Sequence, residues 1–548
     1  MSICSQNGLK SIQDMTGDQN FGGIAARFTL DLARRWSSHD LTSIGSKWAQ
    51  IEETTAWTYT NAFFEEAWEA KLAIVRRDDF EALLRDYFRG PAQKGHLAWF
   101  ALRNTVFACG YRSILAKDPG VSFSEAQVKA GRLFNYALSV LTQILLPPSS
   151  LLAIQALTLM ACYAEGLGNP ALKHFLCSNA VHAAQNKGLH RQPEKSWGIS
   201  EDEAAKRNGL WWTIYTLEKH LSMCSGRPSA IDDDNVSAYP PAGILSQSDI
   251  VPQSLFFATQ HAQICSQISR NLLSARSLQL STPELISTVN HFHQKLMKLL
   301  DEIPDDLKIG TLARPNHPTP HLIHLLYLHF SIYGSLMVVH THFFYPWMSS
   351  RLNATGSEAA MENQIRISSS VVAEAARKII LAVRLVTTTV ATPSWLAFYY
   401  PIYAHINLFI YMLKFPHLST TAADLGLLDV CAGHFGHIDY LTSAHISISL
   451  PRETATLTSK FIKDMKARSQ RPAIQSYHEY PQTHPQARAD TSPQTRTVED
   501  STINFDEMSN DLPTISDNND FLNLDAATWN IFSSFDMVTT NETDFRAF

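Results

Sequence analysis

The chain has 548 residues, of which 45% are hydrophobic and 18% are charged. This apolar content supports a large buried core and excludes a collagen-like or fully disordered chain, and the length allows two to four domains at roughly 100–200 residues each. Seven scattered cysteines favour a reducing compartment over a disulfide framework, and a net charge of −6 gives the whole chain no attraction for nucleic acid.

Most of the chain shows apolar residues at the three- and four-residue spacing of a helix. A capping pattern at 124–127 predicts a helix that runs to Leu146, where two prolines follow. Asn169 and Pro170 predict the start of the next helix, and Gly188 predicts its end. Further helices are expected over 252–278, 282–303, 319–346, 361–388, 395–414 and 452–468. Alternation typical of strands is scarce, so the sequence predicts an all-α, multi-helix protein.

Two apolar segments, 321–347 and 395–415, are long enough to span a membrane. Both contain histidines, and the second also contains Pro401 and Asn407, which makes membrane insertion costly. We therefore expect core helices and no membrane contact, with an integral membrane protein as the alternative. Residues 1–20 contain no cationic start followed by an apolar run, so we also expect no signal peptide.

The composition divides the chain into four parts. We predict a partly disordered N-terminal segment over 1–55 and a helical domain over 56–468, whose recognisable motifs lie within 123–241. Proline, glutamine, serine and threonine then predict a disordered linker over 469–498. The last part, 499–548, holds eleven acidic residues and one basic residue, so it carries −10 and the rest of the chain carries +4.

Three patterns were considered as sites of chemistry. The carboxylates of Asp232, Asp233 and Asp234 could hold Mg²⁺ in a helical enzyme, but Val236 stands where a DDxxD motif needs its last aspartate. The glycine spacing at 166–171 suits a dinucleotide fingerprint, but it follows a predicted helix and not a strand. We interpret both as turns.

Cys431, His434 and His437 have the residue types of a zinc site, with His445 as a fourth candidate. Because the chain has 22 histidines, we interpret this spacing as chance. The sequence thus predicts no catalytic residue, no cofactor and no metal ligand. A metal-dependent α-helical enzyme that uses Asp232, Asp233 and Asp234 stays the alternative.

Four short elements follow one another within residues 169–241. They are a turn that ends in Arg191, a helix with Leu210, Trp211, Trp212 and Tyr215, the sequence Gly226-Arg227-Pro228, and an acidic turn that contains Ile231 and Asp232. In order and spacing this stretch resembles the middle homology region of fungal-specific transcription factors. The resemblance implies a nuclear regulator of a fungal gene set, such as a secondary-metabolite cluster or a nutrient pathway.

The motif residues admit two interpretations. Tryptophan and tyrosine combine a large apolar area with a polar edge, so Trp211, Trp212 and Tyr215 suit a core seam or a partner surface. Arg227 could pair with the acidic turn. These residues would then maintain the fold. The second interpretation is an effector pocket, because the family is thought to regulate its activity through this region.

The usual family member begins with a zinc cluster of six closely spaced cysteines, which places a helix in the major groove of DNA. The first hundred residues here contain one cysteine, Cys4. True loss, alternative splicing and an incomplete gene model remain open as explanations. We therefore expect DNA contact to depend on a partner regulator, through a homodimer or heterodimer, and a non-DNA-binding co-regulator is an alternative.

The acidic part of the chain interleaves its carboxylates with bulky apolar residues, which is typical of disordered activation segments. Trp529, Phe532 and Phe535 step three residues apart, and Asp536 follows them. Such a segment docks as a short helix in the groove of a coactivator. We predict coactivator proteins as partners, with a merely solubilising tail as the alternative.

Overall fold

The computed structural model describes residues 2–37, 50–90, 96–146, 148–167, 169–241, 250–309, 319–351, 358–443 and 447–470. Within these ranges every regular element is a helix, which confirms the all-α prediction. The acidic tail lies outside the described residues, as does the predicted linker apart from its first two residues, which end the last helix.

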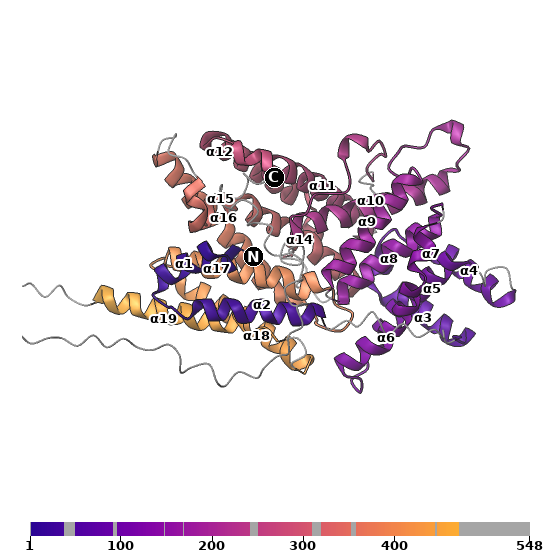
Figure 1. The fold of residues 1–548 in the computed structure, drawn as a ribbon, viewed down its shortest axis with the longest axis horizontal. Helices are drawn as coiled ribbons and strands as arrows, with labels where there is room; N and C mark the ends of the chain where they lie inside the picture. The colour runs from indigo at the N-terminus through magenta and orange to yellow at the C-terminus, as the bar shows by residue number, and fades with distance from the viewer. Residues whose placement is uncertain are drawn as a thin grey trace, which may run out of the picture.

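The helices form two neighbouring bodies (Figure 1). The first contains α3 (Glu53–Glu66), η2 (Trp68–Lys71), α4 (Arg77–Arg89), α5 (Leu97–Leu115), α6 (Phe123–Ser139), α7 (Leu141–Leu145), α8 (Leu151–Leu167), α9 (Pro170–Asn186) and α10 (Glu201–Ser225). Large side chains such as Trp99, Phe134 and Trp211 fill its core. Since α5 and α8 are apolar on nearly every side, neighbouring helices surround both of them.

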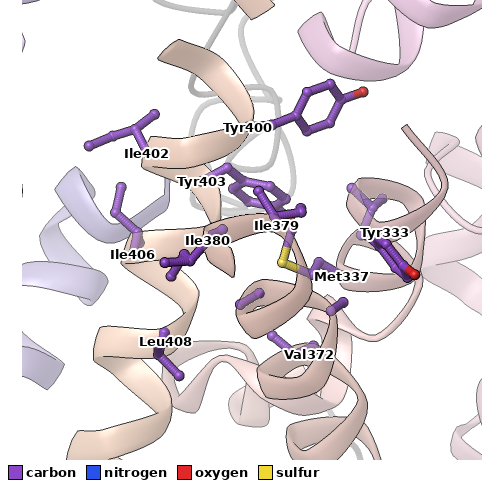
Figure 2. Close-up of a cluster of buried hydrophobic side chains, with 14 of the residues drawn as sticks. Tyr333, Met337, Val372, Ile379, Ile380, Tyr400, Ile402, Tyr403, Ile406 and Leu408 are labelled. Atoms are coloured by element: carbon purple, nitrogen blue, oxygen red, sulfur yellow. The ribbon is translucent and has the colours of Figure 1, made fainter. Parts of the chain in front are cut away.

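The second body is built mainly from the helices that follow α10. It contains α11 (Ile250–Asn271), α12 (Thr282–Glu302), α14 (Thr319–Val339), α15 (Thr341–Phe344), η7 (Pro346–Arg351), α16 (Glu358–Ala382), a π-helical turn η9 (Trp395–Tyr399), α17 (Tyr400–Lys414), α18 (Thr421–Leu441) and α19 (Leu450–Gln470). Figure 2 shows Met337 of α14, Ile379 of α16 and Tyr403 of α17 close together in the core of the second body.

The N-terminal helices α1 (Gln6–Thr16) and α2 (Phe21–Ser37) belong to the second body, beside α17 and α19 (Figure 1). The sequence predicts a partly disordered segment over 1–55, and within it residues 2–37 form helices that pack on the second body. Phe21 and Phe28 share one face of α2 and are buried, and Phe21 stacks on Phe409 at 6.1 Å between ring centroids. This apolar face is covered by helices more than 350 residues away in the chain, which no local pattern reveals.

The two membrane-span candidates are core helices, as expected. The segments His321–Val339 and Trp395–Lys414 pass a length and hydropathy test, yet 83% and 94% of their apolar windows are buried inside the protein. Two of their polar side chains bond to backbone carbonyls: His329 Nε2 donates to the carbonyl of Leu307 at 2.8 Å, and Asn407 Nδ2 donates to the carbonyl of Tyr403 at 2.8 Å.

The predicted helix boundaries are confirmed at α9 and shifted at α6. Asn169 caps α9 by accepting from the backbone N–H of Leu172 at 3.0 Å, and Gly188 takes the left-handed conformation after its end. Helix α6 begins earlier than the capping pattern at 124–127 indicated, because Ser122 caps it and accepts from Glu125 N at 3.2 Å. Either serine fits the local pattern, since each precedes a glutamate or a glutamine by three residues.

Candidate functional site: the two faces of helix α10

Helix α10 lies where the two bodies meet. Its central residues Leu210, Trp211 and Tyr215 belong to the core of the first body, and Met223 near its C-terminus belongs to the core of the second. Ser200 caps the helix by accepting from Glu203 N at 3.2 Å. The polar residues of α10 project from two opposite faces, which have different surroundings.

The first face carries Trp212 and Tyr215 of the motif, and both are buried, as is Trp211 beside them, whose Nε1 has no hydrogen-bond partner among the described residues. Trp212 Nε1 donates to the carbonyl of Tyr239 at 2.8 Å, and Tyr215 Oη donates to Asp233 Oδ1 at 3.1 Å. Burial, with the nearby Asp233, raises the pKa of Tyr215. Both rings therefore hold the segment after α10 against the helix.

The Gly-Arg-Pro sequence turns the chain back along this face. Gly226 ends α10 with a φ of 61°, in the left-handed region that favours glycine. Arg227 is half-buried and Pro228 is exposed. Burial, together with the positive charge of Arg227, lowers the pKa of His174 on α9.

Two buried charged residues of α10, which the sequence prediction missed, organise the same turn. Glu218 is 3% exposed and accepts three hydrogen bonds, from Ala230 N at 2.7 Å and from the hydroxyls of Ser222 and Ser229 at 2.8 Å each. Their position was the available signal, because Glu218 and Lys219 follow Tyr215 by three and four residues and so share its face.

Lys219 connects the remaining part of the turn. Its Nζ donates to the carbonyl of Ile231 at 2.8 Å and to Ser229 Oγ at 2.9 Å, and it pairs with Asp233 Oδ1 at 3.0 Å. Ile231 itself is buried. Trp212, Tyr215, Glu218 and Lys219 are therefore all bonded to the segment 229–239 that follows α10, and together they form one unit.

The acidic turn engages protein groups. Asp232 accepts from the backbone N–H of Asp234 at 3.2 Å and caps the short helix η4 (Asp233–Asn235). Arg270 lies 3.6 Å from Asp232 and 3.8 Å from Asp234, and Ser266 Oγ donates to Asp233. These contacts fit the interpretation of the three aspartates as residues of a turn.

Arg191, the first motif residue, is exposed, and its Nε donates to His190 Nε2 at 3.3 Å. The carbonyl of His190 accepts from the backbone N–H groups of Ser237 and Ala238 at 3.0 Å each. The start and the end of the motif region are thus joined through the residue next to Arg191.

The cysteine and histidines of α18 point in different directions. Cys431 Sγ is buried and donates to the carbonyl of Pro401 at 3.5 Å, His434 Nε2 donates to the carbonyl of Ala397 at 2.7 Å, and His437 is exposed. His445 lies outside the described residues. In the described part of the chain, no group of three or more His, Cys, Asp or Glu could hold a metal ion.

The opposite face of α10 lines a cavity of about 70 Å³ between the two bodies. Thr213, Thr216, Leu217 and His220 come from α10, and the cavity is also lined by three aromatic residues from other elements: Trp68 of η2, Tyr327 of α14 and Trp395 of η9. A second cavity of about 110 Å³ shares His220 and Trp395 with the first and reaches Arg227.

A buried ion pair stands between the two cavities and lines both. Lys173 of α9 contacts the carboxylate of Glu165 on α8. The other oxygen of Glu165 accepts from Ser394 Oγ at 2.7 Å and from the backbone N–H of Trp395 at 3.1 Å. Burial lowers the pKa of Lys173 to about 8. The pair therefore fastens the first body to the start of η9 in the second.

Two histidines complete the cavity wall in their neutral form. His324 Nε2 donates to the carbonyl of Trp68 at 2.9 Å, and burial lowers the pKa of His324 to about 4. His220 Nδ1 lies 3.4 Å from the hydroxyl of Tyr400, and burial lowers the pKa of His220 well below its usual value. Since imidazolium is disfavoured at both positions, the two histidines add no positive charge to the wall at neutral pH.

The activation residues predicted in the tail, Trp529, Phe532, Phe535 and Asp536, lie outside the described residues. The structure therefore places the motif residues of 169–241 in one region and leaves the tail prediction as it stood.

Comparison with known proteins gives a family match over the region around α10. Residues 60–305 match the family model of the fungal specific transcription factor domain. The match begins within α3 and ends just after α12, so it contains the whole of α10 and both of its faces.

Curated relatives extend the similarity. The ABC-transporter-regulating transcription factor of Aspergillus oryzae is 26% identical over 449 residues, which cover 78% of this chain and 49% of that protein. The protein of the same description in Aspergillus fumigatus matches to the same extent. The fusaridione A cluster transcription factor of Fusarium heterosporum is 27% identical over 307 residues, 54% of this chain and 56% of its own length. This chain spans about half the length of the two Aspergillus relatives.

Proposed function

We propose that the chain regulates the transcription of a fungal gene set in the nucleus, because residues 60–305 match the family model of the fungal specific transcription factor domain. The observation that carries the proposal is the match of this domain, which contains the hydrogen-bonded unit of Trp212, Tyr215, Glu218 and Lys219. Relatives named as transcription factors support it from outside the chain.

The target genes form a defined set in this proposal. One relative is named for a biosynthetic cluster, another for ABC transporters, and the lactose regulatory protein LAC9 of Kluyveromyces lactis, 28% identical over 236 residues, for a nutrient. We carry over to this chain the control of such a set, with a secondary-metabolite cluster or a nutrient pathway as the class.

The chain acts in this proposal as a regulator and not as an enzyme. The two clusters that could have served a metal enzyme support this view, because Asp232, Asp233 and Asp234 bond within their own turn and with neighbouring helices, and Cys431 and His434 bond to backbone carbonyls.

The proposal includes two kinds of partner, coactivator proteins and a second regulator. The tail, with Trp529, Phe532 and Phe535, would bind coactivator proteins and make the chain an activator. DNA would be reached through a second regulator in a heterodimer, since residues 1–498 carry a net charge of only +4 and so attract phosphates weakly. A homodimer is the alternative assembly.

Transcript profiling tests the proposal with the full-length chain. The gene is deleted in its host fungus and restored as the wild type or as a variant with Trp529, Phe532 and Phe535 replaced by alanine. Deletion should change a limited set of transcripts, and the wild type should restore them. The triple variant should fail to restore the activated transcripts, because it keeps the charge but loses the apolar side chains that dock.

The matched control replaces Ser533 and Ser534, which lie in the same segment, by alanine, and it should restore transcription fully. An unchanged transcript profile in the deletion strain, while the wild-type strain expresses the protein, would contradict transcriptional control. Full restoration by the triple variant would contradict only the role of the tail.

A further inference from the structure

The cavity on the second face of α10 contains two buried polar groups that stay unsatisfied. Trp68 Nε1 and Thr216 Oγ1 have no hydrogen-bond partner among the described residues, and each of the two residues is 8% exposed. Both residues line the cavity of about 70 Å³. A buried donor without an acceptor destabilises the protein, and a ligand acceptor in the cavity would remove this cost.

The charged groups in the cavity wall already have oxygen partners. Lys173 contacts the carboxylate of Glu165, and Lys71 Nζ donates to the carbonyl of Phe64 at 3.2 Å. His220 and His324 are neutral because burial lowers the pKa of each. An anion that entered here would lose its hydration, and Lys173, the buried cation of the wall, already has the carboxylate of Glu165 as its partner, so the wall favours an uncharged guest.

The remaining wall is apolar and aromatic. Trp395 and Tyr327 pack edge to face with ring centroids 4.7 Å apart, and Leu217 and Ala258 add aliphatic surface. A water molecule needs about 10–15 Å³ of such a volume, so this cavity has room for a guest larger than one water. Apolar walls with a few placed polar groups are typical of small-molecule sites.

We propose that this cavity binds a small uncharged molecule with an apolar body and a hydrogen-bond acceptor, such as a carbonyl oxygen, which Trp68 Nε1 and Thr216 Oγ1 contact. Because the cavity walls come from both bodies, a bound molecule would stabilise their junction. That this molecule acts as an effector of transcription rests on the proposed function, whereas its binding does not.

Three matched probes test the chemistry on the purified full-length chain by ligand-observed NMR titration. Acetophenone has an aromatic body and a carbonyl, ethylbenzene lacks the acceptor, and benzoate carries a negative charge. We expect acetophenone to bind most tightly, about fivefold or more above ethylbenzene, from one or two hydrogen bonds to neutral donors. Tighter binding of benzoate, equal binding of ethylbenzene, or no binding of any probe would overturn the proposal.

Variants locate the site. Thr216→Val and Trp68→Phe each remove one donor and should weaken acetophenone about fivefold without changing ethylbenzene. Ala258→Leu fills the cavity and should abolish the binding of both probes. The matched control is Thr259→Val, because Thr259 Oγ1 is also buried and has no partner among the described residues but does not line this cavity.

A thermal melt of each variant keeps the test independent of folding. The proposal fails if Thr216→Val changes acetophenone binding no more than Thr259→Val does, or if folded Ala258→Leu protein binds acetophenone as the wild type does. Probe binding by a protein that controls no transcripts would contradict the proposed function alone, and transcriptional control without probe binding would contradict the cavity proposal alone.

Discussion

The two faces of helix α10 can be compared directly, because they belong to one helix and differ in what their polar side chains contact. On the face that carries Trp212 and Tyr215 (the motif face), Glu218 makes two polar contacts and Lys219 makes three with the turn that follows, and Glu218 also accepts from Ser222 of the same helix. On the opposite face, which lines the cavity (the cavity face), Thr213 Oγ1 donates to the carbonyl of Gly209 at 2.9 Å, but the hydroxyl of Thr216 has no partner in the described part of the chain. The polar contacts of His220 with Cys224 and Tyr400 are long, at 3.8 and 3.4 Å.

The difference separates two uses of buried polarity. A network whose donors and acceptors are matched fixes one backbone arrangement, and the loss of any member leaves several groups unsatisfied. Unmatched donors beside a cavity lower the stability of the protein and leave hydrogen-bonding capacity for a guest. The motif face therefore explains why the turn at 226–240 has a defined shape, and the cavity face is the place where a ligand changes the energy most.

The largest effect is expected at Glu218. Glu218→Ala removes the acceptor of three hydrogen bonds. Ala230 N and the hydroxyl of Ser222 lose this partner, and the hydroxyl of Ser229 keeps the carbonyl of Ile231 at 3.1 Å. We expect the free energy of unfolding, measured by urea denaturation, to fall by about 3–5 kcal/mol. Glu218→Gln keeps one acceptor oxygen and should lose about half as much.

Glu201→Ala is the control for this change, because Glu201 is an exposed glutamate of the same helix. It should alter the free energy of unfolding by no more than about 1 kcal/mol, the size of an exposed charge effect near a helix N-terminus. If Glu218→Ala were as mild as Glu201→Ala, the matched network would not fix the turn, and the contrast between the two faces would disappear.

The second effect concerns pH and the cavity wall. The folded state holds His324 neutral down to a pKa of about 4, whereas an unfolded chain protonates histidine near pH 6.5. Between these values the unfolded state binds more protons, so stability falls as the pH falls. From pH 7 to pH 5 this group should cost about 2 kcal/mol.

His324→Gln keeps a donor for the carbonyl of Trp68 and removes the titration. Its free energy of unfolding should therefore decline by about 2 kcal/mol less than that of the wild type between pH 7 and pH 5. His437→Gln, on the exposed face of α18, should show the pH dependence of the wild type. Parallel curves for wild type and His324→Gln would mean that the cavity wall accepts a charged histidine.

The smallest effect is expected at Thr216 in the absence of ligand, and it has the opposite sign to that at Glu218. Thr216→Val removes a buried hydroxyl that has no partner among the described residues. The free energy of unfolding, measured by urea denaturation, should therefore stay unchanged or rise by less than about 1 kcal/mol. A loss of stability as large as that of Glu218→Gln would show that the hydroxyl is bonded, and the two faces would then be alike.

Local sequence patterns predicted the helical elements and the motif region well. The fold class and the start of α9 at Asn169 follow from spacing and capping, which act within a few residues. The same kind of pattern placed the start of α6 two residues too late, at Ser124, although Ser122 also precedes a glutamate by three residues.

Long-range packing decided what the patterns missed. Residues 21–37 lie in the segment predicted as partly disordered, because the partner of the apolar face of α2, the core around Phe409, lies far along the chain. Glu218 and Lys219 also look like ordinary surface charges of a helix until the turn after Gly226 folds back over them.

By itself the sequence determined an all-α chain, a motif-bearing stretch over 169–241 and a charge divided between a +4 portion and a −10 tail. These features depend on residue type and spacing, so a single chain displays them. The tertiary structure decided that one face of α10 is matched and the other lines a cavity, because Trp68, Thr216 and Trp395 come from three distant segments. Only the packing of the two bodies brings their side chains to one place.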